Sequence, residues 1–178
     1  MLRKIIAAFF LLIFLSLTGF LIYSALQPEK LPVGALLPSL EYLTANGAET
    51  LKADGSRQAL VLYFHSDCQY CQYELGLLNE NLPKFNQTRL YLLTPEEDFF
   101  SAKKMRSWSN LVNSPVVSWG IVDGSEFKEK FGAKGFPTTF IFDHNGVLLA
   151  KIFGEAKLDK IVSELKKILV VRNAGLAA

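Results

Sequence analysis

The sequence lacks the features that define several classes of protein. No internal repeat and no low-complexity segment occurs in its 178 residues, which excludes a collagen-like chain. Hydrophobic residues make up 50% of the chain, too many for a disordered protein. Their excess lies in one N-terminal run, so a multi-span membrane protein is excluded as well. The rest has an ordinary globular composition and is long enough for one domain with a sizeable core.

An excess of charge of one sign is also missing. The chain has 19 Lys and Arg against 17 Asp and Glu. Arg3 and Lys4, which precede the apolar run, account for the difference, so the rest of the chain is neutral overall. Without a basic stripe to follow phosphates, nucleic acid is not an expected partner.

The apolar run extends from Ile5 to Leu26 and holds 18 apolar residues of 22, with no charged side chain. As a helix it would be about 33 Å long, close to the thickness of a bilayer core. The basic pair Arg3-Lys4 favours a cytoplasmic N-terminus. We predict a cytoplasmic segment at 1–4, a transmembrane anchor at 5–26 and a linker at 27–34, with the rest of the chain on the far side of the membrane.

A cleaved signal peptide is the alternative for this run. Its apolar core would be only about 7–15 residues long and would end in a small-x-small site. The run is longer than that, and Tyr23-Ser24-Ala25 is a poor site of this kind. No cysteine ends the run, which excludes a lipoprotein.

Beyond the linker, apolar runs alternate with helical periodicities. Strands are predicted at Ala59–Phe64, Arg89–Thr94, Val116–Val122, Thr138–Phe142 and Val147–Phe153. Helices are predicted at Cys71–Leu82, Pro95–Trp108, Asp123–Gly132 and Leu158–Leu169. This order indicates an α/β domain over residues 35–170, with a mixed sheet between helices, and a C-terminal tail at 171–178.

Two short motifs support these boundaries. Thr94-Pro95-Glu96-Glu97 has the pattern of a capping box with proline at the first helical position. Asn145-Gly146 lies between the last two predicted strands and is the strongest short hairpin signal.

The chain has only two cysteines, in the segment Cys68-Gln69-Tyr70-Cys71, where a strand ends and a helix begins. One interpretation is a structural disulfide, although so short a loop would contribute only about 2 kcal/mol. A second is a metal site built from His65, Cys68 and Cys71, with His144 as the other histidine. A closed zinc site needs four ligands, whereas copper(I) is less demanding.

The third interpretation, thiol–disulfide exchange, is the one we favour. Cys68 at a helix start would face unpaired backbone N–H groups and the positive end of the helix dipole, so a lowered pKa and a nucleophilic thiolate are expected. Cys71 lies one turn later, within bonding reach, and can resolve the mixed disulfide that Cys68 forms. Export would place this chemistry in a disulfide-forming compartment.

The chain resembles the thioredoxin superfamily and, more narrowly, the membrane-anchored TlpA/ResA-like thiol–disulfide oxidoreductases, over residues 32–169. Pro32–Leu51 is similar to the family's N-terminal extension. Tyr63–Glu74 matches its Cys-x-x-Cys-x-x-Glu pattern, and Gly135–Asp143 matches its Gly-x-Pro-Thr-Thr-Phe segment. The resemblance implies a thioredoxin-like fold, in which helices flank a central mixed β-sheet.

The resemblance also implies roles for individual residues. Pro137 would be a cis proline beside the cysteines, presenting the Phe136 backbone to a substrate strand; a plain strand-start proline is the alternative. Glu74 would be an active-site acid that accepts the Cys71 proton, unless it is an ordinary solvated helix glutamate. Gln69 and Tyr70, between the two cysteines, are expected to contact substrate.

The chain departs from the family pattern at several positions. Asp67 and Tyr70 stand where many relatives have tryptophan and proline, and Leu62 replaces the buried aspartate of ordinary thioredoxins. Asp67 either caps the helix or opposes the ionisation of Cys68. Peroxiredoxins need a threonine where His65 stands, so peroxidase activity is not expected. These changes leave the direction of electron flow open.

The expected function is that of a single-pass oxidoreductase of the bacterial cytoplasmic membrane with a periplasmic domain. The resemblance implies that it reduces disulfides of exported proteins, in the manner of cytochrome c maturation, and is reduced again by a membrane thiol electron carrier. No cofactor and no metal are expected. A copper metallochaperone of the Sco-like type, and a thiol oxidase or isomerase, are the alternatives.

Overall fold

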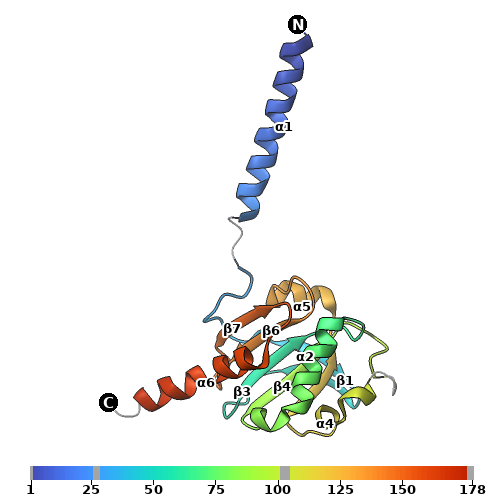
Figure 1. Ribbon diagram of the computed structural model, residues 1–178, viewed down its shortest axis with the longest axis vertical. Helices are drawn as coiled ribbons and strands as arrows, with labels where there is room; N and C mark the ends of the chain where they lie inside the picture. The colour runs from blue at the N-terminus through green and yellow to red at the C-terminus, as the bar shows by residue number, and fades with distance from the viewer. Residues whose placement is uncertain (1, 26–28, 101–104, 176–178) are drawn as a thin grey trace.

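The computed structural model describes residues 2–25, 29–100 and 105–175, and within 105–175 it leaves out the side chains of the C-terminal end. Its centre is a seven-stranded sheet in the order β2-β1-β5-β4-β3-β6-β7 (Figure 1). The strands are β1 (Leu40–Thr44), β2 (Gly47–Leu51), β3 (Gln58–Tyr63), β4 (Thr88–Thr94), β5 (Val117–Ile121), β6 (Thr138–Phe142) and β7 (Leu148–Phe153). The strands β3, β4 and β5 are parallel, and the outer pairs on both sides run antiparallel. The predicted mixed sheet is therefore confirmed.

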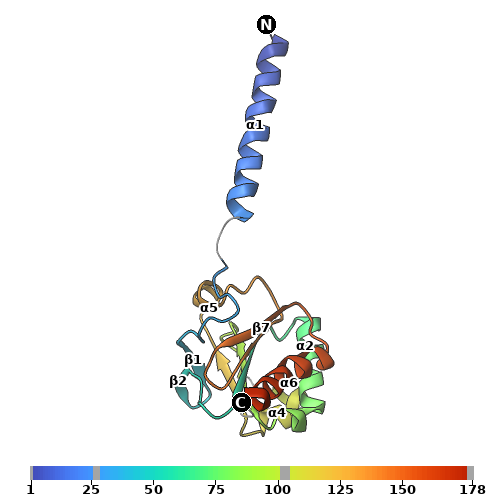
Figure 2. The same cartoon turned by 90° about the vertical axis from the view of Figure 1, so that its left-hand side faces the viewer.

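Helices cover both faces of the sheet, and a further helix precedes it. They are α1 (Leu2–Ala25), α2 (Gln69–Glu80), α4 (Ser109–Val112), α5 (Gly124–Phe131) and α6 (Leu158–Gly175), with 3-10 turns at Leu82–Phe85 and Arg106–Trp108. Figure 2 shows α2, α4 and α6 together on one side of the sheet. The helix α5 covers the opposite face.

The central strand β3 explains why the sheet is buried on both sides. Its side chains alternate between two cores: Leu60 and Leu62 pack toward α2 and α6, whereas Val61 and Tyr63 pack toward α5. A continuous apolar run is what a strand covered by helices on both faces requires. This strand ends directly before the loop that carries the cysteines.

Most predicted elements are confirmed, with boundaries shifted by one or a few residues. Asp123 caps α5 by accepting from the backbone N–H groups of Ser125 and Glu126, and Gly132 ends this helix with a φ of 68°. The β6–β7 hairpin turns at Gly146, with a φ of 81°. The predicted C-terminal helix is α6, and the predicted helix from Cys71 is α2, which begins two residues earlier.

The helix predicted from Pro95 to Trp108 is wrong at its start. Residues 97–100 form a turn, 101–104 lie outside the described residues, and a 3-10 turn and the short α4 follow. The side chain of Glu96 turns inward and accepts from the Thr94 hydroxyl instead of leaving that cap free for Glu97. Glu96 also accepts from Ser66, 30 positions earlier in the sequence. This long-range contact takes the place of the predicted capping box.

The N-terminal part of the domain contains a hairpin that sequence patterns did not predict. Strands β1 and β2 pair with each other, and Leu43 of β1 pairs with Ile121 of β5. The chain is already held on the domain in the predicted linker, because Leu31 is buried and its carbonyl accepts from Lys151 Nζ.

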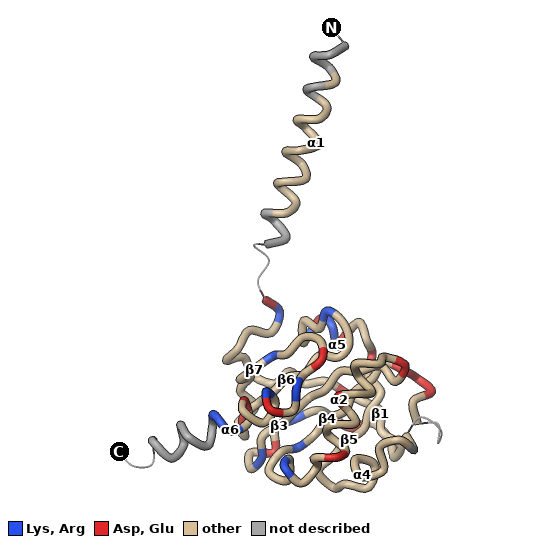
Figure 3. The backbone as a smooth tube through the Cα atoms, in the orientation of Figure 1, with Lys and Arg blue, Asp and Glu red and all other residues tan. Residues whose placement is uncertain are grey.

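Figures 1 and 2 both show α1 standing clear of the domain. Its described side chains, Ile6 and those of residues 9–21, are almost all exposed. Leu26, the last residue of the predicted anchor, lies outside the described residues. Over the part of the chain that the structure describes, no helix has the length and hydropathy needed to cross a membrane. Figure 3 shows charges of both signs scattered over the domain.

Candidate active site

Cys68 occupies the N-cap position of α2. Its backbone is extended (φ −79°, ψ 116°), and its Sγ accepts from the backbone N–H of Cys71 at 3.4 Å. The thiol is partly exposed. An anion at this position is stabilised by the free N–H groups and the dipole of the helix. The structure thus places Cys68 where a nucleophilic thiolate is expected.

Cys71 lies one turn further along α2 and is completely buried. Both cysteines are free thiols. Burial raises the pKa of the Cys71 thiol, and its hydrogen bond with the Cys68 side chain acts in the same direction, while the His65 backbone N–H lowers it. The two sulfurs therefore differ: Cys68 is partly exposed to solvent, whereas the raised pKa of Cys71 favours its protonated form.

Glu74 follows Cys71 on the same face of α2 and is completely buried. Its carboxylate accepts from Thr139 Oγ1 at 2.5 Å and from the Ala156 backbone N–H at 3.1 Å. Burial raises the pKa of Glu74 to about 7, against the lowering effect of these two hydrogen bonds. The negative charge of Glu74 in turn contributes to the raised pKa of Cys71. Glu74 is therefore not a solvated helix glutamate, and at neutral pH it can both take up and release a proton.

Pro137 follows a cis peptide bond, as the resemblance implied. The Phe136 carbonyl oxygen lies 3.9 Å from Cys68 Sγ, and the Phe136 ring packs against Tyr63 at 4.7 Å between centroids. The two motifs, separated by 65 residues in sequence, therefore meet at the exposed sulfur.

Two exposed tyrosines lie on α2, close in sequence to the cysteine pair. Gln69 and Tyr70 are exposed, with 61% of Tyr70 accessible. Tyr73, which the sequence analysis did not single out, is 52% exposed on the next turn. Large exposed rings beside a reactive thiol provide contact area for another polypeptide.

The loop before Cys68 is held by a residue that the sequence analysis assigned to a helix cap. Glu96 accepts from the Ser66 backbone N–H and from Ser66 Oγ, each at 2.6 Å, and from Thr94 Oγ1 at 3.0 Å. Glu96 and Ser66 are both buried. No sequence spacing signals this contact, since the two residues are 30 positions apart.

The positions of the possible ligand atoms do not support the interpretation of the cysteine pair as a metal site. Among the described residues, the group able to offer three ligand atoms within 4.8 Å of one another is His65, Asp67 and Glu96, which contains neither cysteine. The Glu96 oxygens already accept from Ser66 and Thr94, and His65 Nδ1 accepts from the Asp67 N–H at 3.3 Å. The predicted array of His65 with both cysteines does not form.

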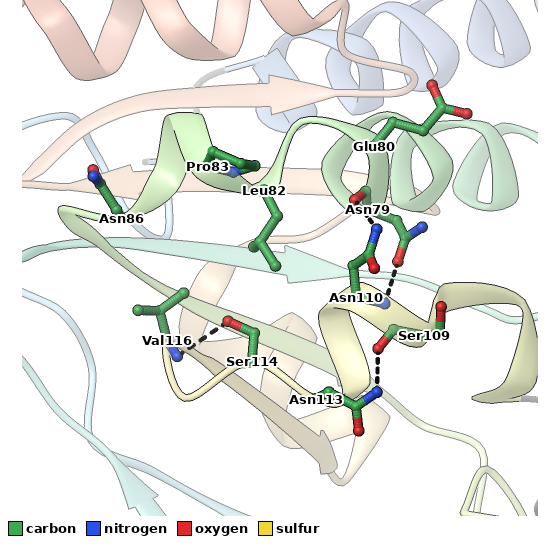
Figure 4. A pocket seen from close by; sticks show the side chains of 10 residues that line it. All are labelled: Asn79, Glu80, Leu82, Pro83, Asn86, Ser109, Asn110, Asn113, Ser114 and Val116. Atoms are coloured by element: carbon green, nitrogen blue, oxygen red, sulfur yellow. Dashed lines mark hydrogen bonds between the residues drawn. The ribbon is translucent and has the colours of Figure 1, made fainter.

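A pocket of about 610 Å³ lies at the opposite end of α2 from the cysteines (Figure 4). It is lined by Asn79, Glu80, Leu82, Pro83, Asn86, Ser109, Asn110, Asn113, Ser114 and Val116. Asn79 Oδ1 accepts from the backbone N–H groups of Asn110 and Leu111, which ties α2 to α4. No predicted site residue lines this pocket.

A family model described as "Thioredoxin-like domain" matches residues 45–169. The chain belongs to this family. The matched segment contains both cysteines, the buried glutamate and the cis proline.

Curated relatives and solved structures agree with this membership. The chain is 26% identical over 171 residues to the thiol-disulfide oxidoreductase ResA of Bacillus thuringiensis subsp. konkukian, covering 93% of this chain and 96% of that protein. It is 25% identical over 171 residues to ResA of Geobacillus thermodenitrificans, with the same coverage. A thiol:disulfide interchange protein, DsbE, from Chlorobium tepidum has a similar fold, with a TM-score of 0.59, 21% identity and coverage of 79% of this chain and 97% of that one. The protein is thus a ResA/TlpA-like member of the thioredoxin superfamily.

The site and the family membership together define the chemistry. A partly exposed thiol at a helix start and a buried thiol one turn later are the two groups that thiol–disulfide exchange requires. The protein is a disulfide oxidoreductase, and the close Cys68–Cys71 pair offers the two thiols that this reaction uses.

Proposed function

We propose that this protein is a membrane-anchored, extracytoplasmic thiol–disulfide oxidoreductase that reduces disulfides of exported proteins. The observation that carries the proposal is the meeting of three groups at one point. Cys68 is partly exposed beside the Phe136–Pro137 loop, and Cys71 and Glu74 lie buried behind it on α2.

The first step is attack by the Cys68 thiolate on a substrate disulfide. A bond forms between Cys68 Sγ and one substrate sulfur, and the other substrate sulfur leaves as a thiolate. Cys71 then gives up its proton, and its sulfur attacks Cys68 Sγ, releasing the second substrate thiolate. The substrate gains two electrons, and the Cys68–Cys71 pair is left as a disulfide.

Glu74 is the base for the second step in this scheme. With a pKa of about 7 it is partly ionised at neutral pH, and it is electrostatically coupled to Cys71. A base with a pKa near the working pH is the most effective proton acceptor. When a membrane thiol carrier reduces the Cys68–Cys71 disulfide, Glu74 returns the proton to Cys71.

Substrate is held beside Cys68 by backbone and by aromatic contacts. A substrate strand that pairs with the backbone at Phe136 would bring its own sulfur to Cys68, whose Sγ already lies 3.9 Å from the Phe136 oxygen. Tyr70 and Tyr73 offer exposed rings on the helix side of the same thiol. Exported proteins with unfolded, extended cysteine segments, such as apocytochromes c, suit this arrangement.

The burial of Cys71 favours reduction over oxidation. Strong oxidants of this superfold stabilise their reduced thiolate. Here the buried surroundings of Cys71 raise the pKa of its thiol and so disfavour a thiolate at that position. A disulfide whose reduced form gains no such stabilisation at Cys71 has a lower reduction potential.

The membrane anchor is proposed from the sequence of the N-terminus. The run at 5–26 has the length and composition of a span, and Arg3 and Lys4 orient it with the domain outside the cytoplasm. Its helical part, α1, stands clear of the domain in Figures 1 and 2, and the apolar side chains of residues 9–15 are exposed. The bacterial cytoplasmic membrane, with the domain in the periplasm, is the corresponding location.

Two measurements test the proposal. Equilibration of the Cys68–Cys71 pair with glutathione should give a reduction potential of about −270 mV or below. A value of about −120 mV would instead indicate an oxidase. In cells, Cys71→Ser should accumulate mixed disulfides with exported proteins through Cys68. Reduction of insulin that survives Cys68→Ser would refute the assignment of the nucleophile.

A further inference from the structure

Glu96 is a buried carboxylate that contacts the loop and the strand end around the cysteine pair. Its oxygens accept from the backbone N–H and the hydroxyl of Ser66 and from the hydroxyl of Thr94. One of them lies 3.8 Å from His65 Nδ1, and the side chain of Glu96 is only 6% exposed. Hydrogen bonds to a carboxylate are stronger than those between neutral groups.

The loop that Glu96 holds connects β3 to the redox centre. At its start, the Phe64 N–H donates to the Leu93 carbonyl at 3.0 Å. In its middle, the Ser66 carbonyl accepts from Gln72 Nε2 at 2.8 Å. At its end, the Cys68 N–H donates to the His65 carbonyl at 3.1 Å. Glu96 therefore binds the centre of a short segment whose far end is the N-cap of α2.

We propose that Glu96 is a positioning residue for the second step of thiol–disulfide exchange. Acting through Ser66, it holds the loop so that the two cysteines are aligned for ring closure. This inference rests on the proposed function and adds a residue from the segment after β4 to a site that otherwise comes from α2 and the loop before β6.

The second step depends on this loop more than the first. Attack by Cys68 uses a sulfur stabilised by the Cys71 N–H, which is part of α2 itself. Ring closure instead needs the two sulfurs in a fixed relative position, and the Cys68 residue is tied to the held loop by the hydrogen bond from its N–H to the His65 carbonyl at 3.1 Å. Releasing Ser66 would loosen Cys68 relative to Cys71, which is fixed in α2.

The test follows both steps with oxidised glutathione as the probe. Reduced full-length protein in detergent is mixed with the probe and quenched with acid at successive times. Attack by Cys68 releases one glutathione thiolate and leaves Cys68 joined to the other glutathione. Attack by Cys71 releases the second glutathione and leaves the Cys68–Cys71 disulfide. Mass analysis separates the reduced, mixed-disulfide and oxidised forms.

Glu96→Gln should slow the second step about tenfold, the effect of losing one hydrogen bond to a charged group, and leave the first step within about threefold of the wild type. The neighbouring Glu97 is exposed and is the matched control. Glu97→Gln should leave both steps unchanged.

Three results would overturn the inference. They are an unchanged second step in Glu96→Gln, equal slowing of both steps, and an equal effect of Glu97→Gln. If Glu96→Gln does not fold, Ser66→Ala is the second variant, because it removes one of the three hydrogen bonds to Glu96. Ser66→Ala should slow the second step about threefold. An unchanged rate of the second step in this variant would contradict the inference. A wild-type Cys68 that does not attack glutathione disulfide would refute the proposed function, and this inference with it.

Discussion

Two buried acids on one helix face, Cys71 and Glu74, determine how protons move at this site. Each is raised in pKa by burial, and the charge on Glu74 raises the pKa of Cys71 further. Two negative charges so close together in a buried region are costly, so the pair is expected to keep at least one proton near neutral pH. A comparison with ordinary thioredoxins also identifies Glu74 as the buried acid of this site. Leu62 replaces their buried aspartate on β3, and here the buried acid comes from α2.

Glu74→Gln should slow ring closure by about 100-fold at pH 7, because the amide cannot accept the Cys71 proton. In the wild type the rate should rise with pH through about 7, as Glu74 ionises. In the variant this rise should be lost, and the rate should climb only at higher pH as Cys71 ionises unaided. Stopped-flow measurement of ring closure against pH checks both statements. Glu80→Gln, at an exposed position of the same helix, should behave as the wild type.

Stability should also depend on Glu74. Its pKa of about 7 in the folded protein lies above the ordinary value of 4.5 for a glutamate, so the folded state binds the proton more tightly than the unfolded state. The free energy of unfolding should therefore fall as the pH rises from about 4.5 to about 7, by roughly 3 kcal/mol. Urea denaturation across this range checks the slope. A Glu74→Gln variant that shows the same slope would contradict the origin assigned to it.

At the scale of elements, α2 is held at both ends by contacts from other parts of the chain. Phe136 contacts its N-cap residue, Cys68, and Asn79 near its C-terminus accepts from two N–H groups at the start of α4. Asn79 thus acts on α4 as an N-cap supplied by another helix. Free N–H groups at a helix start need such an acceptor.

Asn79→Ala should lower the free energy of unfolding by about 1 kcal/mol, the usual effect of losing a helix cap. The glutathione equilibrium of the cysteine pair should not change, because the lost contacts lie at the other end of α2. Asn86, which lines the same pocket and is exposed, provides the control variant Asn86→Ala. Urea denaturation and the glutathione equilibrium together check the prediction. A large shift in the redox equilibrium would show that the two ends of α2 are coupled.

At the scale of the whole molecule, the domain and the N-terminal helix differ in composition. The domain carries charges of both signs and the proposed redox site, whereas no charge is drawn on the described part of α1 (Figure 3). Holding the domain at a membrane surface would keep it near a membrane-bound electron donor and near proteins emerging from export.

The full-length protein should remain in the membrane fraction after alkaline carbonate extraction, with its N-terminal residues intact by mass spectrometry. Replacing both Leu12 and Leu15 with arginine should move the protein out of this fraction, because each arginine at the centre of a span costs about 2.5–3.5 kcal/mol. Leu36→Arg, at an exposed position on the domain, should have no such effect. A soluble wild-type protein lacking its first residues would instead indicate a cleaved signal peptide.

The sequence alone determined the order of strands and helices, the location of the cysteine pair at a helix start and the family resemblance. These follow from local spacing, since a buried strand, an amphipathic helix and an N-cap each have a short-range pattern. The β1–β2 hairpin was not predicted because β2 is exposed at four of its five residues and β1, which alternates between buried and exposed positions, is only five residues long.

Only the tertiary structure decided what the acidic side chains do. Glu96 and Glu97 are adjacent in a motif that predicts a helix cap, yet one is buried against Ser66 and the other is exposed. The depth of Glu74, and with it a pKa near 7, depends on Thr139 and Ala156, which are distant in sequence. Burial and hydrogen-bond partners set the energy of a charge, and both come from segments that meet only when the chain has folded.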